Sequence, residues 1–270
     1  MSTIREHWPE YLIEAGCLAA FMVSAAGFAT LLFHPASPLA GVIASPTLAR
    51  VPMGIAMGLT AVVIIYSRPG QRSGAHMNPA VTLAFLRLGR IAPAHAAAYI
   101  VAQFAGGYLG ILAAAAALGG LPADPAINYV ATVPGPAGPV VAVVAETVIS
   151  FVLMATVLVV SSHPATARFT GLAAGTLVAL YITFEDPLSG MSMNPARTLG
   201  PALLSGATDH LWVYFIGPVL GMSVAADLFA RIHTRAAHGC AKLHHPQDGF
   251  CIFRCGTAAR SIGRKEAAAA

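Results

Sequence analysis

Charged side chains are scarce in this sequence, and their scarcity excludes most classes of soluble protein. Of the 270 residues only 10% are charged, whereas 57% are hydrophobic. A soluble globular domain carries about 25% charged residues. We therefore expect the chain to lie in a lipid bilayer. A soluble enzyme is excluded by this composition, and we find neither a nucleotide-binding glycine loop nor a catalytic cluster in the sequence.

Cysteine is also sparse, and three of the four cysteines lie near the C-terminus. Cys17 falls in the first apolar run, whereas Cys240, Cys251 and Cys255 lie in the tail. Residues 231–270 contain seven basic and two acidic side chains, so the net positive charge of the chain is there. A basic tail on a hydrophobic body is typical of a cytoplasmic end rather than of a nucleic-acid-binding protein. Stable disulfides are rare in that compartment.

Apolar segments of about 20 residues, the length that crosses a bilayer, occur six times. The sequence predicts spanning helices at about 11–33, 50–67, 94–117, 138–160, 168–184 and 210–231. Connections rich in proline and glycine, at 34–52 and 118–139, separate some of them. The first run is longer than the core of a signal peptide, so we interpret it as a spanning helix.

Arginine and lysine lie mostly on one side of this predicted topology. With both termini inside, only Arg50 falls outside, and Arg197 needs a separate explanation. The outside connections, 118–139 and 185–193, contain acids but no lysine or arginine. Because basic residues favour the inner side, we expect both termini to be cytoplasmic, in the inner (plasma) membrane of the cell. The side chains on the inner side are Arg5, Arg68, Arg72, Arg87, Arg90, Arg168 and those of the tail.

A ten-residue segment occurs twice with seven letters unchanged, as SGAHMNPAVT at 73–82 and SGMSMNPART at 189–198. Glu14 in the first predicted helix and Glu146 in the fourth form a second repeated pair. Three helices, an odd number, lie in each repeat, so the two halves must be inverted relative to each other. Inverted repeats place a functional site near the bilayer midplane, where interrupted helices meet.

Each repeated segment leads into an apolar helix that is too short to cross the membrane. The run from Pro79 to Leu88 spans about 15 Å at 1.5 Å per residue, half of a roughly 30 Å hydrocarbon core. Asparagine is a strong N-cap and proline is favoured at the first helical position. Asn78 and Asn194 therefore start re-entrant half-helices whose N-termini meet near the centre. The alternative, two ordinary Asn-Pro turns, does not account for two copies at equivalent places.

These boxes resemble those of the aquaporin family, the major intrinsic proteins. The matching residues are Asn78-Pro79-Ala80, Asn194-Pro195-Ala196-Arg197, Glu14, Glu146, Tyr99–Gly110 and Ser189–Leu203. The resemblance implies an all-α integral membrane fold of six transmembrane helices and two re-entrant half-helices, an inverted 3+3 repeat. It also implies a homotetramer with passive flux of water or small neutral solutes, and no cofactor. We assign residues 1–233 to this channel domain and residues 234–270 to a basic cytoplasmic tail.

The resemblance also assigns roles to single residues. Arg197 forms the outer constriction, and counting back from the second box adds Met191 and Ile182 to the same ring. The corresponding position on the second helix adds Met57. Glu14 and Glu146 accept hydrogen bonds from the re-entrant loops, with a proton relay as the alternative.

The predicted ring lacks the aromatic residue and the histidine of familiar water-selective members, and Thr198 replaces the aspartate usual in glycerol channels. Three functions stay open at this point. The first is a water channel, and the second is a facilitator of glycerol, urea or metalloid acids. The third is a coupled secondary transporter that uses Glu14 or Glu146.

Histidines and tail cysteines leave further alternatives. His76, two residues before the first box, is either a pH-gating residue or a packed residue at the pore mouth. The tail is either a basic or membrane-surface segment, with Phe250 and Phe253 at the lipid, or a metal or redox site. We therefore assign no metal, and name as weak candidates for one Cys240, His244, His245, Cys251 and Cys255.

Overall fold

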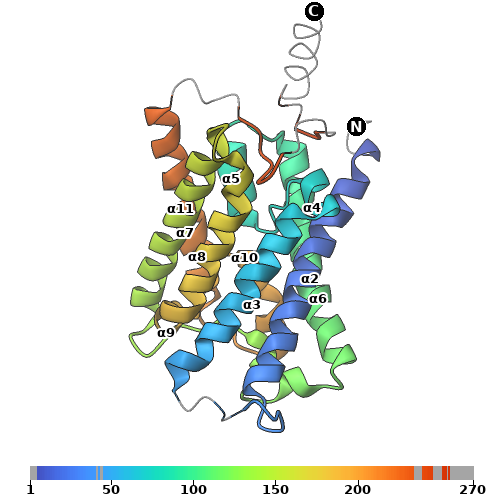
Figure 1. Cartoon of the computed structure of the whole chain (residues 1–270), viewed down its shortest axis with the longest axis vertical. Helices are drawn as coiled ribbons and strands as arrows, with labels where there is room; N and C mark the ends of the chain where they lie inside the picture. The colour runs from blue at the N-terminus through green and yellow to red at the C-terminus, as the bar shows by residue number, and fades with distance from the viewer. Residues whose placement is uncertain are drawn as a thin grey trace, which may run out of the picture.

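The computed structural model describes residues 5–40, 42, 45–233, 239–245, 251–253 and 255. Within these ranges the regular structure is helical, and six helices are long and apolar enough to cross a membrane (Figure 1). This confirms the predicted all-α membrane fold. The six helices are α2 (Trp8–Phe33), α3 (Pro46–Tyr66), α6 (Pro93–Ala117), α7 (Pro139–Ser162), α8 (Thr170–Phe184) and α11 (Leu211–Ile232).

The predicted boundary of the second helix was wrong by four residues, because its prolines do not end it. Pro46 occupies the first helical position of α3, where a missing N–H leaves no bond unmade. The Ser45 hydroxyl accepts a hydrogen bond from the Leu48 N–H and caps the helix. Pro52 also lies inside α3, where it removes one backbone hydrogen bond without ending the helix.

Two short helices, which the sequence did not predict, precede the repeated boxes. These are α4 (Arg68–Ser73) and α9 (Asp186–Ser189). Each ends at a glycine in the left-handed conformation, Gly74 with φ 108° and Gly190 with φ 81°. This conformation strains residues with a Cβ, which explains why glycine is the second letter of both repeated segments.

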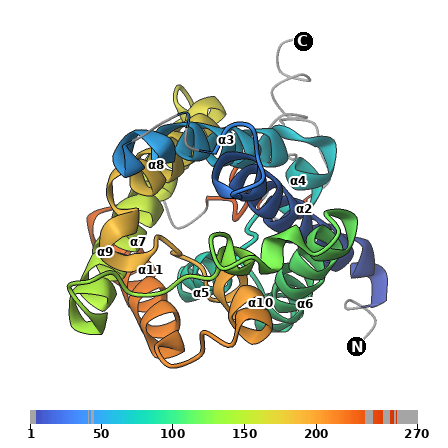
Figure 2. The same cartoon turned by 90° about the horizontal axis from the view of Figure 1, so that it is seen from below.

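The half-helices are α5 (Pro79–Arg87) and α10 (Pro195–Ser205). Each packs against the third long helix of the other half: α5 contacts α11, and α10 contacts α6. Viewed along the bundle, both lie between α6 and α11 (Figure 2). The predicted inverted arrangement of two half-helices is therefore present.

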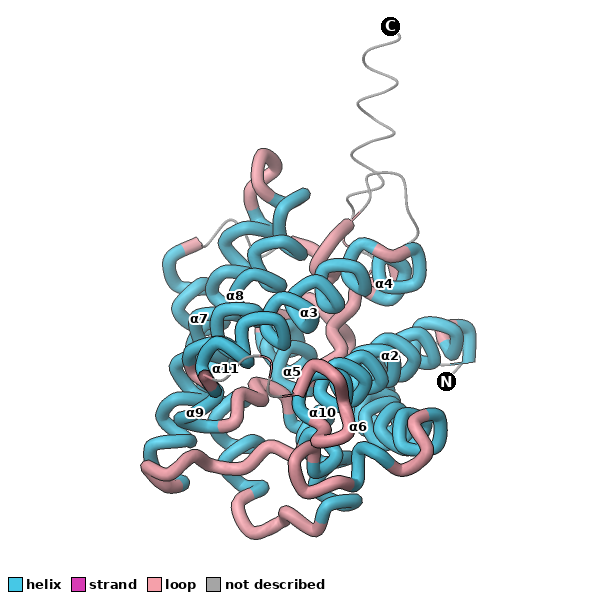
Figure 3. The backbone as a smooth tube through the Cα atoms, turned by 60° about the horizontal axis from the view of Figure 1, so that its bottom comes forward, coloured by secondary structure: helices cyan, strands magenta, loops and turns pink. Residues whose placement is uncertain are grey.

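The long helices pack most extensively as α2 with α6, α3 with α8, and α7 with α11. Between α3 and α8 the contact depends on glycine, since a Cβ at Gly58 would lie 2.5 Å from the Gly175 carbonyl oxygen. Such small residues allow helix backbones to approach closely in a membrane. Loops lie at both ends of the bundle (Figures 1 and 3). The start of α2 and the end of α11 lie at the same end, which we call the termini end (Figure 1). The remaining elements are the short 3-10 helices η1 (Leu121–Ala123), η2 (Asn128–Val130) and η3 (Ala167–Phe169).

Candidate functional site

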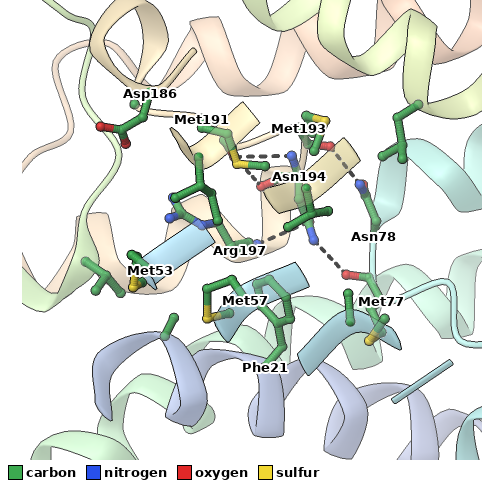
Figure 4. A pocket seen from close by; sticks show the side chains of 18 of the residues that line it. Phe21, Met53, Met57, Met77, Asn78, Asp186, Met191, Met193, Asn194 and Arg197 are labelled. Carbon is green, nitrogen blue, oxygen red and sulfur yellow. Dashed lines mark hydrogen bonds between the residues drawn. The ribbon is translucent and has the colours of Figure 1, made fainter. Parts of the chain in front are cut away.

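A cavity of about 730 Å³ lies inside the bundle. Its walls come from α2, α3, α7 and α8, and from the loops that lead into both half-helices. Both box asparagines line it, as do the four residues of the predicted ring. Figure 4 shows both asparagines with Met57, Met191 and Arg197. These six lining residues are Asn78, Asn194, Met57, Ile182, Met191 and Arg197.

The two asparagines begin the half-helices and connect the halves of the protein. Asn78 Oδ1 accepts a hydrogen bond from the Ala80 N–H at 2.8 Å, and Asn194 Oδ1 accepts one from the Ala196 N–H at 3.0 Å. Asn78 Nδ2 donates to the Met193 carbonyl at 2.7 Å. Asn194 Nδ2 donates to the Met77 carbonyl, also at 2.7 Å (Figure 4). Each cap is thus held by the loop of the opposite repeat.

Glu14 supports the first loop from α2 and is completely buried. One carboxylate oxygen accepts from the Ser73 hydroxyl at 2.7 Å and from the His76 N–H at 3.1 Å. The other accepts from the Met77 N–H at 2.7 Å and from Gln103 Nε2 at 2.9 Å. These bonds satisfy loop donors that lipid could not.

Glu146 supports the second loop from α7 in the same way. One of its oxygens accepts from the Ser189 hydroxyl at 2.9 Å and from the Ser192 N–H at 2.7 Å. The other accepts from the Met193 N–H at 2.7 Å. The two glutamates therefore have equivalent partners 116 residues apart in the sequence.

The carboxylates hold a strained backbone. Met77 has φ 51° and Met193 has φ 53°, values that non-glycine residues rarely adopt. Such a conformation costs of the order of 1–3 kcal/mol per residue and persists where surrounding structure determines it. The backbone N–H of Met77 donates to Glu14, and that of Met193 donates to Glu146. The buried carboxylates therefore stabilise the turn before each box.

Arg197 lies in the first turn of α10, and its side chain points into the cavity near Met57 (Figure 4). Its Nη1 is buried without a hydrogen-bond partner among the described residues. Asp186 lines the cavity toward the end opposite the termini, together with Arg50. Burial raises the pKa of Asp186, while the positive charges of Arg50 and Arg197 act in the opposite direction. This mouth of the cavity therefore carries both signs of charge.

The cavity wall near Arg197 is apolar. Met53 and Phe21 line the cavity beside Met57 and Arg197 (Figure 4). Phe21 was not among the predicted residues, although a signal was present: it lies seven residues after Glu14, two turns along the same face of α2.

Two tyrosines were also missed as supports of the loops. The Tyr99 hydroxyl donates to the Ser73 carbonyl at 2.7 Å, and the Tyr214 hydroxyl donates to the Ser189 carbonyl at 2.6 Å. Both tyrosines are buried. A comparison of the two halves near the 116-residue spacing of the boxes would have found this pair, which lies 115 residues apart.

At the termini end, His76 is buried and has partners on both ring nitrogens. Nδ1 is 3.1 Å from the Thr82 hydroxyl, and Nε2 is 2.7 Å from the carbonyl of Ala241 in the tail. The ring stacks on Phe85 and on Phe253. This geometry fits a packed residue at the cavity mouth, and Phe253 lies against protein rings rather than lipid. Phe250 is outside the described residues.

The tail brings four of the five candidate metal ligands together. The ligand atoms of Cys240, His245, Cys251 and Cys255 all lie within 4.8 Å of one another. His244 is the exception, since its ring packs against Tyr66 with centroids 4.8 Å apart. Most of the predicted tail, residues 234–270, lies outside the described residues.

Taken together, the fold and the site define an integral membrane protein built as an inverted repeat with two facing half-helices. Residues 6–229 match the family described as Major intrinsic protein. Because this match covers most of the chain, the protein belongs to that family. Members of the family are passive channels rather than enzymes.

Relatives of this chain include plant proteins named aquaporins. "Aquaporin NIP1-3" of Oryza sativa subsp. japonica is 41% identical over 173 residues, which are 64% of this chain and 58% of that protein. "Putative aquaporin NIP4-1" of Arabidopsis thaliana is 40% identical over 177 residues, 62% of this chain and 58% of that protein. The chain thus spans less than two thirds of the length of these two relatives. "Aquaporin NIP1-4" of Oryza sativa subsp. japonica is 34% identical over 222 residues, 82% of this chain and 76% of that protein.

The fold is similar to that of the aquaglyceroporin from Plasmodium falciparum, solved by X-ray crystallography. The TM-score is 0.68, and the match covers 86% of this chain and 98% of that one. At 21% sequence identity this likeness concerns the fold alone.

Proposed function

We propose that this protein is a passive channel for water, with the described cavity as its pore. The observation that carries the proposal is the meeting of two half-helix N-termini at Asn78 and Asn194 inside one cavity. The relatives named aquaporins support it.

The chemistry of the meeting point suits small neutral molecules. A helix N-terminus carries about half a positive elementary charge, so two of them disfavour a cation at the same position. Each asparagine amide nitrogen carries two protons, and one is used on the opposite loop. The second is available to hydrogen-bond a passing solute. Arg197 adds a full positive charge and further donors to the wall.

A second candidate function is the passage of small uncharged solutes such as glycerol, urea or metalloid acids. The apolar wall formed by Met57, Ile182 and Met191 favours it. Methionine side chains are flexible and adapt to solutes of different shape, and an apolar wall does not select for water by hydrogen bonding. Thr198, which is fully buried, occupies the position where glycerol channels of the family usually have aspartate. This difference argues against a channel dedicated to glycerol.

The coupled transporter is the least favoured function. This hypothesis assigns the coupling to Glu14 or Glu146, which would then have to meet the solute or the coupling ion. Glu14 and Glu146 do not line the cavity, and their oxygens accept loop hydrogen bonds. Their geometry supports the role of loop supports.

We further propose that the termini end faces the cytoplasm and that the protein is a homotetramer in the plasma membrane. The orientation is supported by the arginines at this end, which include Arg68 and Arg72 in α4 and Arg87 at the end of α5. The tetramer follows from the family resemblance, and its mass in detergent solution would test it.

Stopped-flow light scattering of liposomes tests the channel. The purified chain and a form ending at His233 are both needed, because Leu243 reaches the cavity from the tail. We expect water permeability above that of empty vesicles, without dependence on an ion or proton gradient. Reswelling driven by each solute of a panel would identify permeant solutes.

A matched pair of variants links the flux to this cavity. Met57→Trp fills the cavity wall and should abolish flux, whereas Leu59→Trp, on the exposed side of the same helix, should leave it unchanged. Permeability of both chain forms equal to that of empty vesicles, for water and for every solute, would contradict the proposal. Gradient-dependent flux would instead support the transporter.

A further inference from the structure

The tail residues at the termini end form a compact cluster that channel function alone does not require. Cys240 Sγ lies 3.5 Å from Cys251 Sγ, Cys251 Sγ lies 3.5 Å from Cys255 Sγ, and Cys255 Sγ lies 3.5 Å from His245 Nε2. Three thiols and one imidazole therefore surround a common point.

These distances match the ligand shell of a tetrahedral zinc ion. With Zn–S bonds of about 2.3 Å and Zn–N bonds of about 2.0–2.1 Å, tetrahedral ligand atoms lie roughly 3.6–3.8 Å apart. A Cys₃His set is one of the usual structural zinc sites. The sequence spacing also fits, since Cys251 and Cys255 are separated by three residues and His245 follows Cys240 by five.

A disulfide explains the cluster less well. A disulfide joins two sulfurs at about 2.05 Å, but Cys251 is equally distant from Cys240 and Cys255. Any one bridge would leave the third thiol and the imidazole unused. If the termini end is cytoplasmic, as proposed above, the compartment also disfavours disulfides.

The surroundings suit a charged metal centre. Zinc with three thiolates and a neutral imidazole has a net charge of −1. Lys242 is buried, at 3% exposure, and interacts electrostatically with all three cysteines. The backbone nitrogen of Lys242 lies 3.5 Å from Cys240 Sγ, so its N–H is in position to donate to a metal-bound thiolate.

The cluster is attached to the end of the cavity. Between Cys240 and His245, the Ala241 carbonyl accepts from His76 Nε2 at 2.7 Å, and the Leu243 N–H donates to the Gly74 carbonyl at 3.1 Å. Leu243 lines the same cavity as Asn78 and Asn194.

Phe253, which lies between Cys251 and Cys255 in the sequence, makes a second contact with the channel. Its ring stacks on His76 with an interplanar angle of 2° and centroids 5.5 Å apart. Residues of the tail thus meet the loop that precedes the first box on both sides of the cluster.

We propose that Cys240, His245, Cys251 and Cys255 bind one Zn²⁺ ion, and that the bound ion holds residues 241–243 as a plug over the termini end of the cavity. The plug contains no helix or strand of its own. Its position therefore depends on a few hydrogen bonds and on the four ligands that converge beside it. Loss of the metal releases the plug and opens the mouth. The closing role depends on the proposed channel function, whereas the metal site does not.

Metal analysis of the purified, reduced full-length protein tests the site directly. We expect about one zinc ion per chain. Co²⁺ in place of zinc should give the strong visible bands of a tetrahedral thiolate site. Cys251→Ser and His245→Asn should lose both signals. His244→Asn and Cys17→Ala, outside the cluster, should retain them, and a monodisperse gel-filtration peak would show that each variant is folded.

Two outcomes overturn the metal site. One is a wild-type chain that, after incubation with Zn²⁺ or Co²⁺, holds no metal above the level in Cys251→Ser. The other is a disulfide among the three cysteines, found by mass spectrometry in protein isolated under reducing conditions.

Flux in liposomes tests the plug separately. A membrane-permeant zinc chelator should raise the flux of the wild type to that of the chain ending at His233, and should not change the flux of Cys251→Ser. Equal flux of the wild type with and without chelator, beside a faster truncated chain, refutes the plug. Absence of flux in both the full-length and the truncated chain refutes the channel function but leaves the zinc content as an independent result.

Discussion

The buried carboxylate of Glu146 gives a sharp test of how the second loop is held. In Glu146→Gln, one side-chain oxygen can still accept from Ser189 and Ser192. The new amide group, however, replaces the oxygen that accepts from the Met193 N–H at 2.7 Å, so that two hydrogen-bond donors face each other. An unsatisfied buried donor costs about 1–3 kcal/mol, and the weakening of a charge-assisted bond adds to it. We expect a total loss of about 3 kcal/mol.

A change of this size is measurable as a melting temperature in detergent. For 150–250 residues, 1 kcal/mol shifts the midpoint by about 2–4 °C, so the expected decrease is roughly 6–12 °C. Glu14→Gln should show a similar loss, since its bonds to His76 and Met77 are equivalent. Glu6→Gln, which removes the same charge from an exposed position, should change stability by less than about 0.5 kcal/mol. If Glu146→Gln and Glu6→Gln melt at the same temperature, the carboxylate does not hold the loop as we argue.

Two other substitutions test the packing and the selectivity. Gly107→Ala would place a Cβ 2.4 Å from the Ala196 carbonyl and should lower stability by about 1–3 kcal/mol, measured by the same melting assay. Gly16→Ala has no neighbour within 4 Å and should be neutral or stabilising; equal melting of the two would refute the close contact. Ile182→His adds a hydrogen-bonding wall to the cavity, so solute reswelling in liposomes should fall more than water flux. Ile182→Val should preserve the original ratio, and an unchanged ratio in Ile182→His would show that this position does not select.

The features predicted correctly from the sequence are those that depend on short stretches of chain. Six apolar segments specify six spanning helices, since the length of each is set by the bilayer. Asn78-Pro79 and Asn194-Pro195 specify half-helices, because N-caps act within a single turn. The predicted start of α3 was wrong because Pro46 occupies its first position, where proline is tolerated, and Pro52 lies inside the helix without ending it.

Residues that were missed depend on how distant elements meet. Phe21 reaches the cavity only because α2 presents the face of Glu14 to the interior. The spacing of the tail cysteines indicated possible ligands, but it could not exclude His244 or predict that Leu243 lies at the cavity end. Those contacts join segments more than 160 residues apart, and no local pattern encodes them. The roles of the ring residues and of Arg197 stay predictions, which the flux experiments address.

Each half-helix packs against a long helix of the opposite repeat, and this arrangement has a consequence for biosynthesis. The chain completes α5 early, but its partner α11 is the last long helix to be made. At 5–20 residues per second, the stretch from Arg87 to Ile232 takes roughly 7–30 s to synthesise. During this interval the loop before α5 has only first-half partners, namely Glu14 on α2 and Tyr99 on α6. Glu14 therefore keeps the newly made loop in shape until the second half arrives, and the crossed asparagine bonds close the assembly last.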